Sequence, residues 1–241
     1  MSFKPRQSAA LALAALIALT GCQGLISTPS SSQVRIIDVS AETPNLDVYQ
    51  SHEALAYSLG FGTITSYVPV LPGTYTIAAN STGSAQVISA AKETFLPSTQ
   101  YTVLIGDGAA RAQQLTLEDQ NRPAAQGQIA LRFIGEASRA GAVDIYLVPP
   151  RQTLTDARPI VTNVTLGANT GYLSAAAGIY TIFMLPAGTV PSTTTIPVYA
   201  GTQVAYTEGS ARTVILIDQR QISGYHLQII AANDYDPPSA S

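Results

Sequence analysis

The sequence predicts an all-β fold of two tandem immunoglobulin-like antiparallel β-sandwiches. Its segments are short and rich in β-branched residues, and apolar and polar side chains alternate in Tyr75-Thr76-Ile77 and Tyr101-Thr102-Val103. Turn signals such as Pro72-Gly73 recur about every 8–12 residues, the spacing of a sandwich. Charged residues make up only 11% of the chain, a composition that favours strands over solvated helices.

The motifs of the chain occur twice in the same order, which predicts two copies of one domain. The offset between matching positions grows from 97 to 105 and then to 111, as insertions at loops would make it grow. We expect the extra chain of the second copy around residues 200–210. The matched positions are Asp47 and Asp144, Tyr75 and Tyr180, and Thr102 and Thr213.

The predicted domains are separated by the Pro- and Gly-containing segment 121–127, which suits a short linker. The first sandwich is expected over residues 34–122 and the second, a divergent repeat, over residues 128–234. The Ser-rich segment 22–33 is expected to be a flexible tether, and residues 235–241 a disordered tail.

Two repeated residue types predict local structure within each copy. Asp47 and Asp144 are expected to accept hydrogen bonds from backbone donors of an adjacent turn. Tyr75 and Tyr180 follow a glycine turn, and we expect their rings to lie between the sheets with the hydroxyl at the rim. Residues 84–94 combine Ala and Lys with β-branched residues, which leaves helix and strand open there.

The N-terminus has the layout of a secretory signal peptide over residues 1–21. Lys4 and Arg6 precede an apolar run over residues 9–19, which is shorter than the roughly 20 residues of a spanning helix. Small residues then lead to Cys22, the only cysteine of the chain. This end is similar to a bacterial lipobox, formed here by Leu19, Thr20, Gly21 and Cys22.

A lipobox predicts a lipoprotein whose cysteine sulfur carries a diacylglyceryl group and whose mature chain begins at Cys22. Acyl chains such as palmitate would hold it on a membrane, since each buried CH₂ contributes about 0.8 kcal/mol. Gln23 favours the outer membrane over the inner one. In a host with a single membrane, the anchor would attach to that membrane.

Composition argues against a nucleic-acid partner and against an internal disulfide. The net charge is −3, and loss of Lys4 and Arg6 with the signal peptide leaves ten basic and fifteen acidic residues, or −5. Because no basic stripe is present, we expect no nucleic-acid partner. With Cys22 committed to lipid, no internal disulfide can form.

No motif of the sequence predicts catalysis or a cofactor. The two histidines, His52 and His226, are too few and too distant for a zinc site. Gly106-Asp107-Gly108 lacks the lysine and further glycines of a phosphate loop, so a tight turn is expected. The acidic pairs Glu118-Asp119 and Asp234/Asp236 lack calcium-loop spacing, and we expect them to be solvated acidic edges.

The first copy contains an ordered set of motifs: the segment 34–49, Leu59-Gly60-Phe61-Gly62, Ser66-Tyr67, the segment 72–77, Tyr101-Thr102-Val103 and the segment 115–119. On these motifs, residues 34–122 resemble the bacterial envelope family named domain of unknown function 4397. The resemblance implies a secreted or lipid-anchored β-domain that occurs in one or more copies, and it implies no activity.

The leading expectation is a non-catalytic binding or display module of the cell envelope, with an envelope protein or a polysaccharide as partner. One alternative is a carbohydrate-binding module in which surface tyrosines stack on sugar rings. The other is a hydrolase of envelope polymers, for which no site residues are found. The tyrosines available for stacking are Tyr57, Tyr67, Tyr172, Tyr199, Tyr206 and Tyr225.

Overall fold

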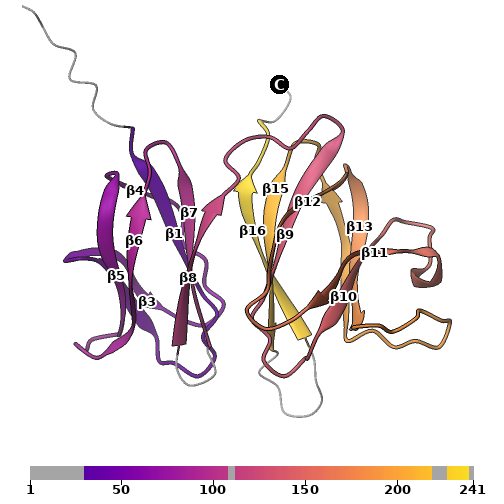
Figure 1. Ribbon diagram of the computed structural model, residues 1–241, viewed down its shortest axis with the longest axis horizontal. Coiled ribbons are helices and arrows are strands. Elements are labelled where there is room, and N and C mark those ends of the chain that lie inside the picture. Colours follow the sequence, from indigo (N-terminus) through magenta and orange to yellow (C-terminus); the bar gives the residue numbers. More distant parts are fainter. Residues whose placement is uncertain (1–29, 108–111, 219–226, 239–241) are drawn as a thin grey trace, which may run out of the picture.

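The computed structural model describes residues 30–107, 112–218 and 227–238 (Figure 1). It confirms the predicted fold class: four four-stranded sheets form two sandwiches that lie side by side. The predicted signal peptide, the lipobox with Cys22 and most of the tether lie outside the described residues. Within those residues, no helix is long and apolar enough to cross a membrane.

The first sandwich contains eight strands in two sheets, ordered β4-β1-β7-β8 and β3-β2-β5-β6. Alternation explains its core, because Val34 and Ile36 of the first strand point between the sheets. The strands are β1 (Ser32–Asp38), β2 (Leu46–Gln50), β3 (Glu53–Leu59), β4 (Val68–Val70), β5 (Gly73–Ser81), β6 (Val87–Phe95), β7 (Gln100–Asp107) and β8 (Ala112–Asp119).

The second sandwich repeats this plan with sheets ordered β12-β9-β15-β16 and β11-β10-β13-β14. Ile129, Leu131 and Phe133 of its first strand are fully buried in its core. The strands are β9 (Gln128–Gly135), β10 (Val143–Val148), β11 (Pro159–Val164), β12 (Asn169–Ala176), β13 (Gly178–Pro186), β14 (Tyr199–Tyr206), β15 (Ala211–Asp218) and β16 (Leu227–Tyr235).

One strand pair in each sandwich is parallel, which differs from the all-antiparallel expectation. β1 runs parallel to β7, and β9 runs parallel to β15. Parallel neighbours need a long crossover connection, and here the strands of the opposite sheet supply it. The ambiguous segment 84–94 is largely strand, since β6 pairs with β5 through nearly all of its length.

The extra chain of the second copy lies in two loops and not around residues 200–210 as expected. Residues 149–158, which include a short 3₁₀ turn at Leu154–Asp156, replace the tight turn between β2 and β3. Residues 187–198 replace the short β5–β6 connection. Residues 200–210 are mostly strand, because β14 continues to Tyr206.

The two sandwiches meet through one sheet each, so the molecule has four β-layers (Figure 1). The facing sheets are the one that contains β1, β7 and β8 and the one that contains β9, β15 and β16. A third apolar cluster fills the space between them. Its buried members are Ile37, Val39, Leu104, Leu117, Ile134, Ile215, Ile217 and Ala232.

Candidate functional site

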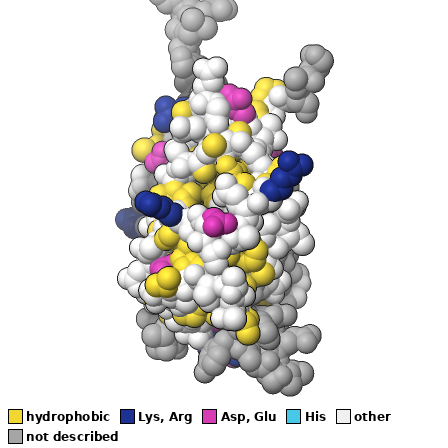
Figure 2. Space-filling model, turned by 90° about the vertical axis from the view of Figure 1, so that its right-hand side faces the viewer, with side chains coloured by type: hydrophobic (Ala, Val, Ile, Leu, Met, Phe, Trp, Pro, Cys, Tyr) yellow, Lys and Arg dark blue, Asp and Glu magenta, His cyan; other side chains and the backbone are white. Residues whose placement is uncertain are grey.

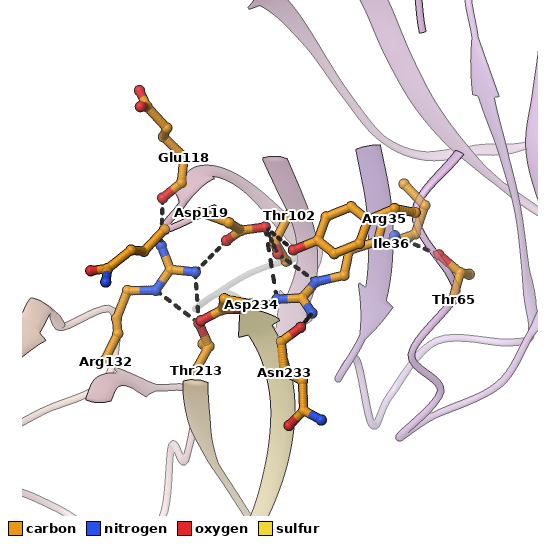
Figure 3. A network of polar contacts seen from close by, with 12 residues as sticks. Arg35, Ile36, Thr65, Thr102, Glu118, Asp119, Arg132, Thr213, Asn233 and Asp234 are labelled. Atoms are coloured by element: carbon orange, nitrogen blue, oxygen red, sulfur yellow. Dashed lines mark hydrogen bonds and ion pairs between the residues drawn. The ribbon is translucent and has the colours of Figure 1, made fainter. Parts of the chain in front are cut away.

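A buried polar cluster lies within the apolar contact between the sandwiches (Figure 3). Alternation places Arg35 on the same face of β1 as Ile37, and Arg132 on the same face of β9 as Ile134. The charged groups are therefore carried into the interface by strands whose other face forms a sandwich core. Arg35 and Arg132 are each only 3% exposed, so both depend on protein partners for their hydrogen bonds.

Arg35 is held by both sandwiches. Its Nη2 forms an ion pair with Asp234 of the second sandwich, and its Nη1 donates to the backbone oxygen of Asn233 at 2.6 Å. Its Nε donates to Thr102 Oγ1 at 2.8 Å, within the first sandwich. The Asp119 carboxylate lies 3.7 Å from Nη2, so two acids neutralise this guanidinium.

Arg132 makes the equivalent set of contacts, with the two sandwiches exchanged. Its Nη2 donates to Asp119 Oδ1 of the first sandwich at 2.5 Å, and its Nη1 donates to the Glu118 backbone oxygen at 2.9 Å. Its Nε donates to Thr213 Oγ1 at 3.0 Å, within the second sandwich. Each arginine thus forms its shortest ion pair with the acid of the other sandwich.

The cluster has a pseudo-twofold arrangement that follows the sequence repeat. Each threonine hydroxyl donates to the acid of its own sandwich, Thr102 to Asp119 at 2.6 Å and Thr213 to Asp234 at 2.7 Å. The offsets between partners grow through 97, 105, 111 and 115 positions. The equivalent pairs are Arg35 and Arg132, Tyr67 and Tyr172, Thr102 and Thr213, and Asp119 and Asp234.

Two tyrosines cover the arginines. The guanidinium of Arg35 lies 4.8 Å from the ring centre of Tyr67, and that of Arg132 lies 4.7 Å from the ring centre of Tyr172. The Tyr67 hydroxyl donates to Asp119 at 2.7 Å. Burial, together with the nearby carboxylates, raises the pKa of both tyrosines above the usual range, so both hydroxyls stay protonated as donors.

The expectation of solvated acidic edges is wrong for Asp119 and Asp234, which are 4% and 5% exposed. Burial raises the pKa of Asp234, and Arg35 opposes that shift. A signal for this burial was present in the sequence: Leu115, Leu117 and Asp119 alternate on one face of a strand. Every carboxylate of the cluster is occupied by an arginine and by hydroxyl donors, an arrangement that suits structure and leaves no free acid–base pair.

Glu136 of the second sandwich is a further polar side chain that reaches the first sandwich. The Glu136 carboxylate lies against Gly106, so close that a Cβ there would meet Oε2 at 2.2 Å. Burial, and then the charge of Asp107, raise the pKa of Glu136 to about 7. Asp107 itself accepts hydrogen bonds from the backbone amides of Ala41 and Glu42.

The predicted role of the repeated aspartates Asp47 and Asp144 is confirmed. Asp47 accepts from the amides of Ser58 at 2.8 Å and Gly83 at 3.2 Å. The hydrogen bond from the Ser58 amide is the main reason that the pKa of Asp47 is lowered. Asp144 accepts from the amides of Asn163 and Gly188.

The repeated tyrosines also lie where expected. The Tyr75 ring packs against the first core and stacks on Phe95 at 6.3 Å between ring centres. Tyr180 packs against the second core, and its hydroxyl donates to the backbone oxygen of Ala176 at the rim.

The structure describes five of the six tyrosines that were considered for stacking on sugar rings. Tyr67 and Tyr172 lie in the interface, and Tyr206 is only 6% exposed. Tyr199 packs against the second core, which leaves Tyr57, 67% exposed, on the surface. Tyr225 lies outside the described residues.

The described residues hold no group of three or more His, Cys, Asp or Glu side chains placed to bind a metal ion. His52 is exposed in the turn after β2. His226 lies outside the described residues. The strand β7 ends at Asp107, and Gly108 of the expected turn also lies outside them.

The outer face of the second sandwich carries many hydrophobic side chains and few charged ones (Figure 2). Ile179 on β13 is 46% exposed. Val190 and Ile196 in the β13–β14 loop are 84% and 87% exposed. A protruding uncharged loop with two exposed aliphatic side chains is a feature of contact surfaces.

Comparison with known proteins gives one family match. Residues 32–146 match the model described as domain of unknown function (DUF4397), a range that covers the first sandwich, β9 and part of β10. No curated protein matches the chain.

Solved structures give only distant likenesses. A product complex of SpuA, a multi-modular glycogen-degrading pneumococcal virulence factor, has 9% identity and a TM-score of 0.26. The match covers 80% of this chain and 21% of that one. A streptococcal virulence factor that binds alpha-glucan has 8% identity and a TM-score of 0.24, with 77% of this chain and 93% of that one covered. TM-scores of this size establish neither a shared fold nor a shared ligand.

Proposed function

We propose that this protein is a non-catalytic, lipid-anchored module of the bacterial cell envelope that presents its surface to an envelope protein or polysaccharide. The observation that carries the proposal is the buried cluster between the sandwiches. It ties Arg35 and Arg132 to acids of the opposite sandwich and fixes two domains as one body. A fixed body suits display, whereas a hinged pair would suit closure around a substrate.

The same cluster argues against the hydrolase alternative. The buried acids Asp119 and Asp234 are the strongest candidates for acid–base chemistry among the described residues. Both are engaged by arginine and by hydroxyl donors. A catalytic acid needs an open approach for the scissile bond, and these carboxylates have none because they are almost fully buried.

The anchor in this proposal is the acylated Cys22. Ser32, the first residue of β1, follows ten positions after it. An extended chain of that length reaches up to about 35 Å. The sandwiches would therefore stand close to the membrane while their far surfaces stay available to a partner.

The experiment that tests the proposal separates membranes from soluble protein in cells that produce the wild type or Cys22→Ala. The wild type is expected in washed membranes, with an N-terminal peptide that begins at an acylated Cys22 by mass spectrometry. Cys22→Ala is expected to lose that mass and to leave the washed membranes. Gln23→Asp is the matched control, which keeps acylation and shifts the protein toward the inner membrane.

Two results would contradict the proposal. An unmodified, uncut N-terminus in the wild type would remove the anchor. Release of products from purified envelope polymers by the protein would replace the non-catalytic module with the hydrolase.

A further inference from the structure

A groove of about 450 Å³ lies on one open side of the first sandwich. It runs between β6 and β8, the last strands of their respective sheets. Consecutive residues of β6, from Val87 to Ala91, form one wall, and Ala112 and Gln114 of β8 form the other. All of these side chains are uncharged.

Several polar atoms at this groove are buried and have no hydrogen-bond partner in the structure. They are both amide atoms of Gln114 and the Ser89 hydroxyl, and both residues line the groove. Buried polar groups in proteins almost always have partners, because an unpaired group bears the cost of its lost hydration. At an open groove such atoms find their partners in water or in a bound molecule.

The second sandwich serves as an internal reference for this side of the fold. The 115-residue offset of Asp119 and Asp234 aligns β8 with β16. At the matched positions the second sandwich is apolar, and Leu227 and Ile229 pack into its core. The matched pairs are Ala112 and Leu227, Gln114 and Ile229, and Thr116 and Ala231.

The opposite wall differs in the same way. Ser89 pairs with Ala79 across β5 and β6, and Tyr199 pairs with Met184 at the equivalent place in β13 and β14. The Tyr199 ring packs against the second core. Leu227, Ile229 and Tyr199 therefore pack into this side of the second sandwich, where the first sandwich has Ala112, Gln114 and Ser89.

We infer that the β6–β8 groove binds a short stretch of neutral saccharide. A glutamine amide offers a donor and an acceptor together, and a serine hydroxyl offers both in one atom, which suits sugar hydroxyls. The small apolar side chains Ala90 and Ala91 can contact the C–H faces of a ring. A volume near 450 Å³ lies within the ordinary range for small-molecule sites.

An extended peptide is the less favoured occupant. β6 and β8 contact each other directly across the open side. A strand inserted between them would need about 4.8 Å to each neighbour.

This inference rests on the proposed function only in that it gives the non-catalytic module a ligand class. Its test is calorimetric titration of the purified full chain in a sugar-free detergent. The probes are cellotriose, maltotriose, mannotriose and chitotriose, with trigalacturonate as the charged control and an eight-residue alternating peptide as the strand control. We expect at least one neutral trisaccharide to bind and both controls to fail.

Gln114→Ile, which copies Ile229 of the second sandwich, is expected to weaken that binding at least tenfold and to raise Tm. Gln113→Ala is the matched control on the exposed neighbour and is expected to leave affinity unchanged. Ser89→Tyr, which copies Tyr199, fills the groove from the other wall and is expected to abolish binding, so the test stands if Gln114→Ile does not fold.

Three results would overturn the inference: no neutral trisaccharide binds, binding survives both groove variants, or the peptide binds in place of the sugars. Titration of the purified chain does not depend on the Cys22 anchor. Failure of the groove and failure of the membrane proposal are therefore read out separately.

Discussion

Arg35 and Asp234 form an ion pair between two residues that lie 199 positions apart and belong to different sandwiches. The equivalent pair, Arg132 and Asp119, crosses the same interface in the opposite sense. Two guanidinium groups and two carboxylates balance in charge, which is the condition for burial of such a cluster. The sandwiches are therefore tied by reciprocal contacts and not only by the linker.

Removal of one acid from the cluster is expected to destabilise the whole chain. Asp234→Asn leaves Arg35 with only the more distant Asp119 carboxylate, 3.7 Å away. Loss of one partner from a buried ion pair costs about 3–5 kcal/mol. We expect urea unfolding to give a free energy of unfolding lower by about 3 kcal/mol.

The control for this prediction is the exposed ion pair between Arg139 and Asp218, whose arginine side chain is 62% exposed. Arg139→Met is expected to change stability by less than about 1 kcal/mol, since water screens the pair. The double variant Arg35→Met/Asp234→Leu removes both charges and should recover most of the loss. Equal losses in Asp234→Asn and Arg139→Met would show that the buried pair has no special role.

Stability is expected to depend on pH through Glu136. Burial raises its pKa from 4.5 to about 7, so between these values the folded chain holds a proton that the unfolded chain releases. The free energy of unfolding should therefore fall as pH rises from 4.5 to 7, by up to about 3 kcal/mol from this group.

The variant that isolates this effect is Glu136→Gln, which keeps the size and removes the titration. Its stability at pH 8 should exceed that of the wild type, and the two chains should converge near pH 4. Denaturant curves at several pH values measure both. Parallel pH profiles for the two proteins would exclude Glu136 as the source.

Two buried glycines should respond differently to an added methyl group. A Cβ at Gly135 would meet the backbone oxygen of Thr165 at 2.0 Å, which can move only with the chain. At Gly106 the near atom is Glu136 Oε2, the end of a flexible side chain. We expect Gly135→Ala to cost about 1–3 kcal/mol.

Gly106→Ala is the matched comparison for this prediction. Its loss of stability should be smaller, because the Glu136 side chain can rotate toward solvent. Thermal unfolding of both variants measures the difference. A larger loss at Gly106 would mean that the Glu136 carboxylate is held more firmly than its surroundings suggest.

Much of the fold follows from local chemistry that the sequence displays. Alternation in Tyr75-Thr76-Ile77 predicted a strand, which is found. The repeated aspartates Asp47 and Asp144 were predicted to accept hydrogen bonds from backbone amides, and they do. The loops that carry the extra chain were misplaced. An offset in a repeat records how many residues were added before a given motif, and it does not record in which connection they lie.

The interface cluster could be predicted only in part. Arg35 and Arg132 interrupt apolar runs at equivalent positions, which is a signal for buried charge. Their partners could not be identified, because each acid comes from the other sandwich and the packing of one domain on the other has no local pattern. The β6–β8 groove was missed for the same reason, since it needs the relative placement of two edge strands.

The relative placement of the sandwiches is most directly tested by a distance between spin labels. The labels would occupy Thr76→Cys on β5 and Gln203→Cys on β14, both exposed on outer sheets, in a chain with Cys22→Ala. Electron–electron double resonance should give one narrow distance distribution, and the addition of Asp234→Asn should broaden it. A broad distribution in the chain that retains Asp234 would contradict a fixed pair of sandwiches.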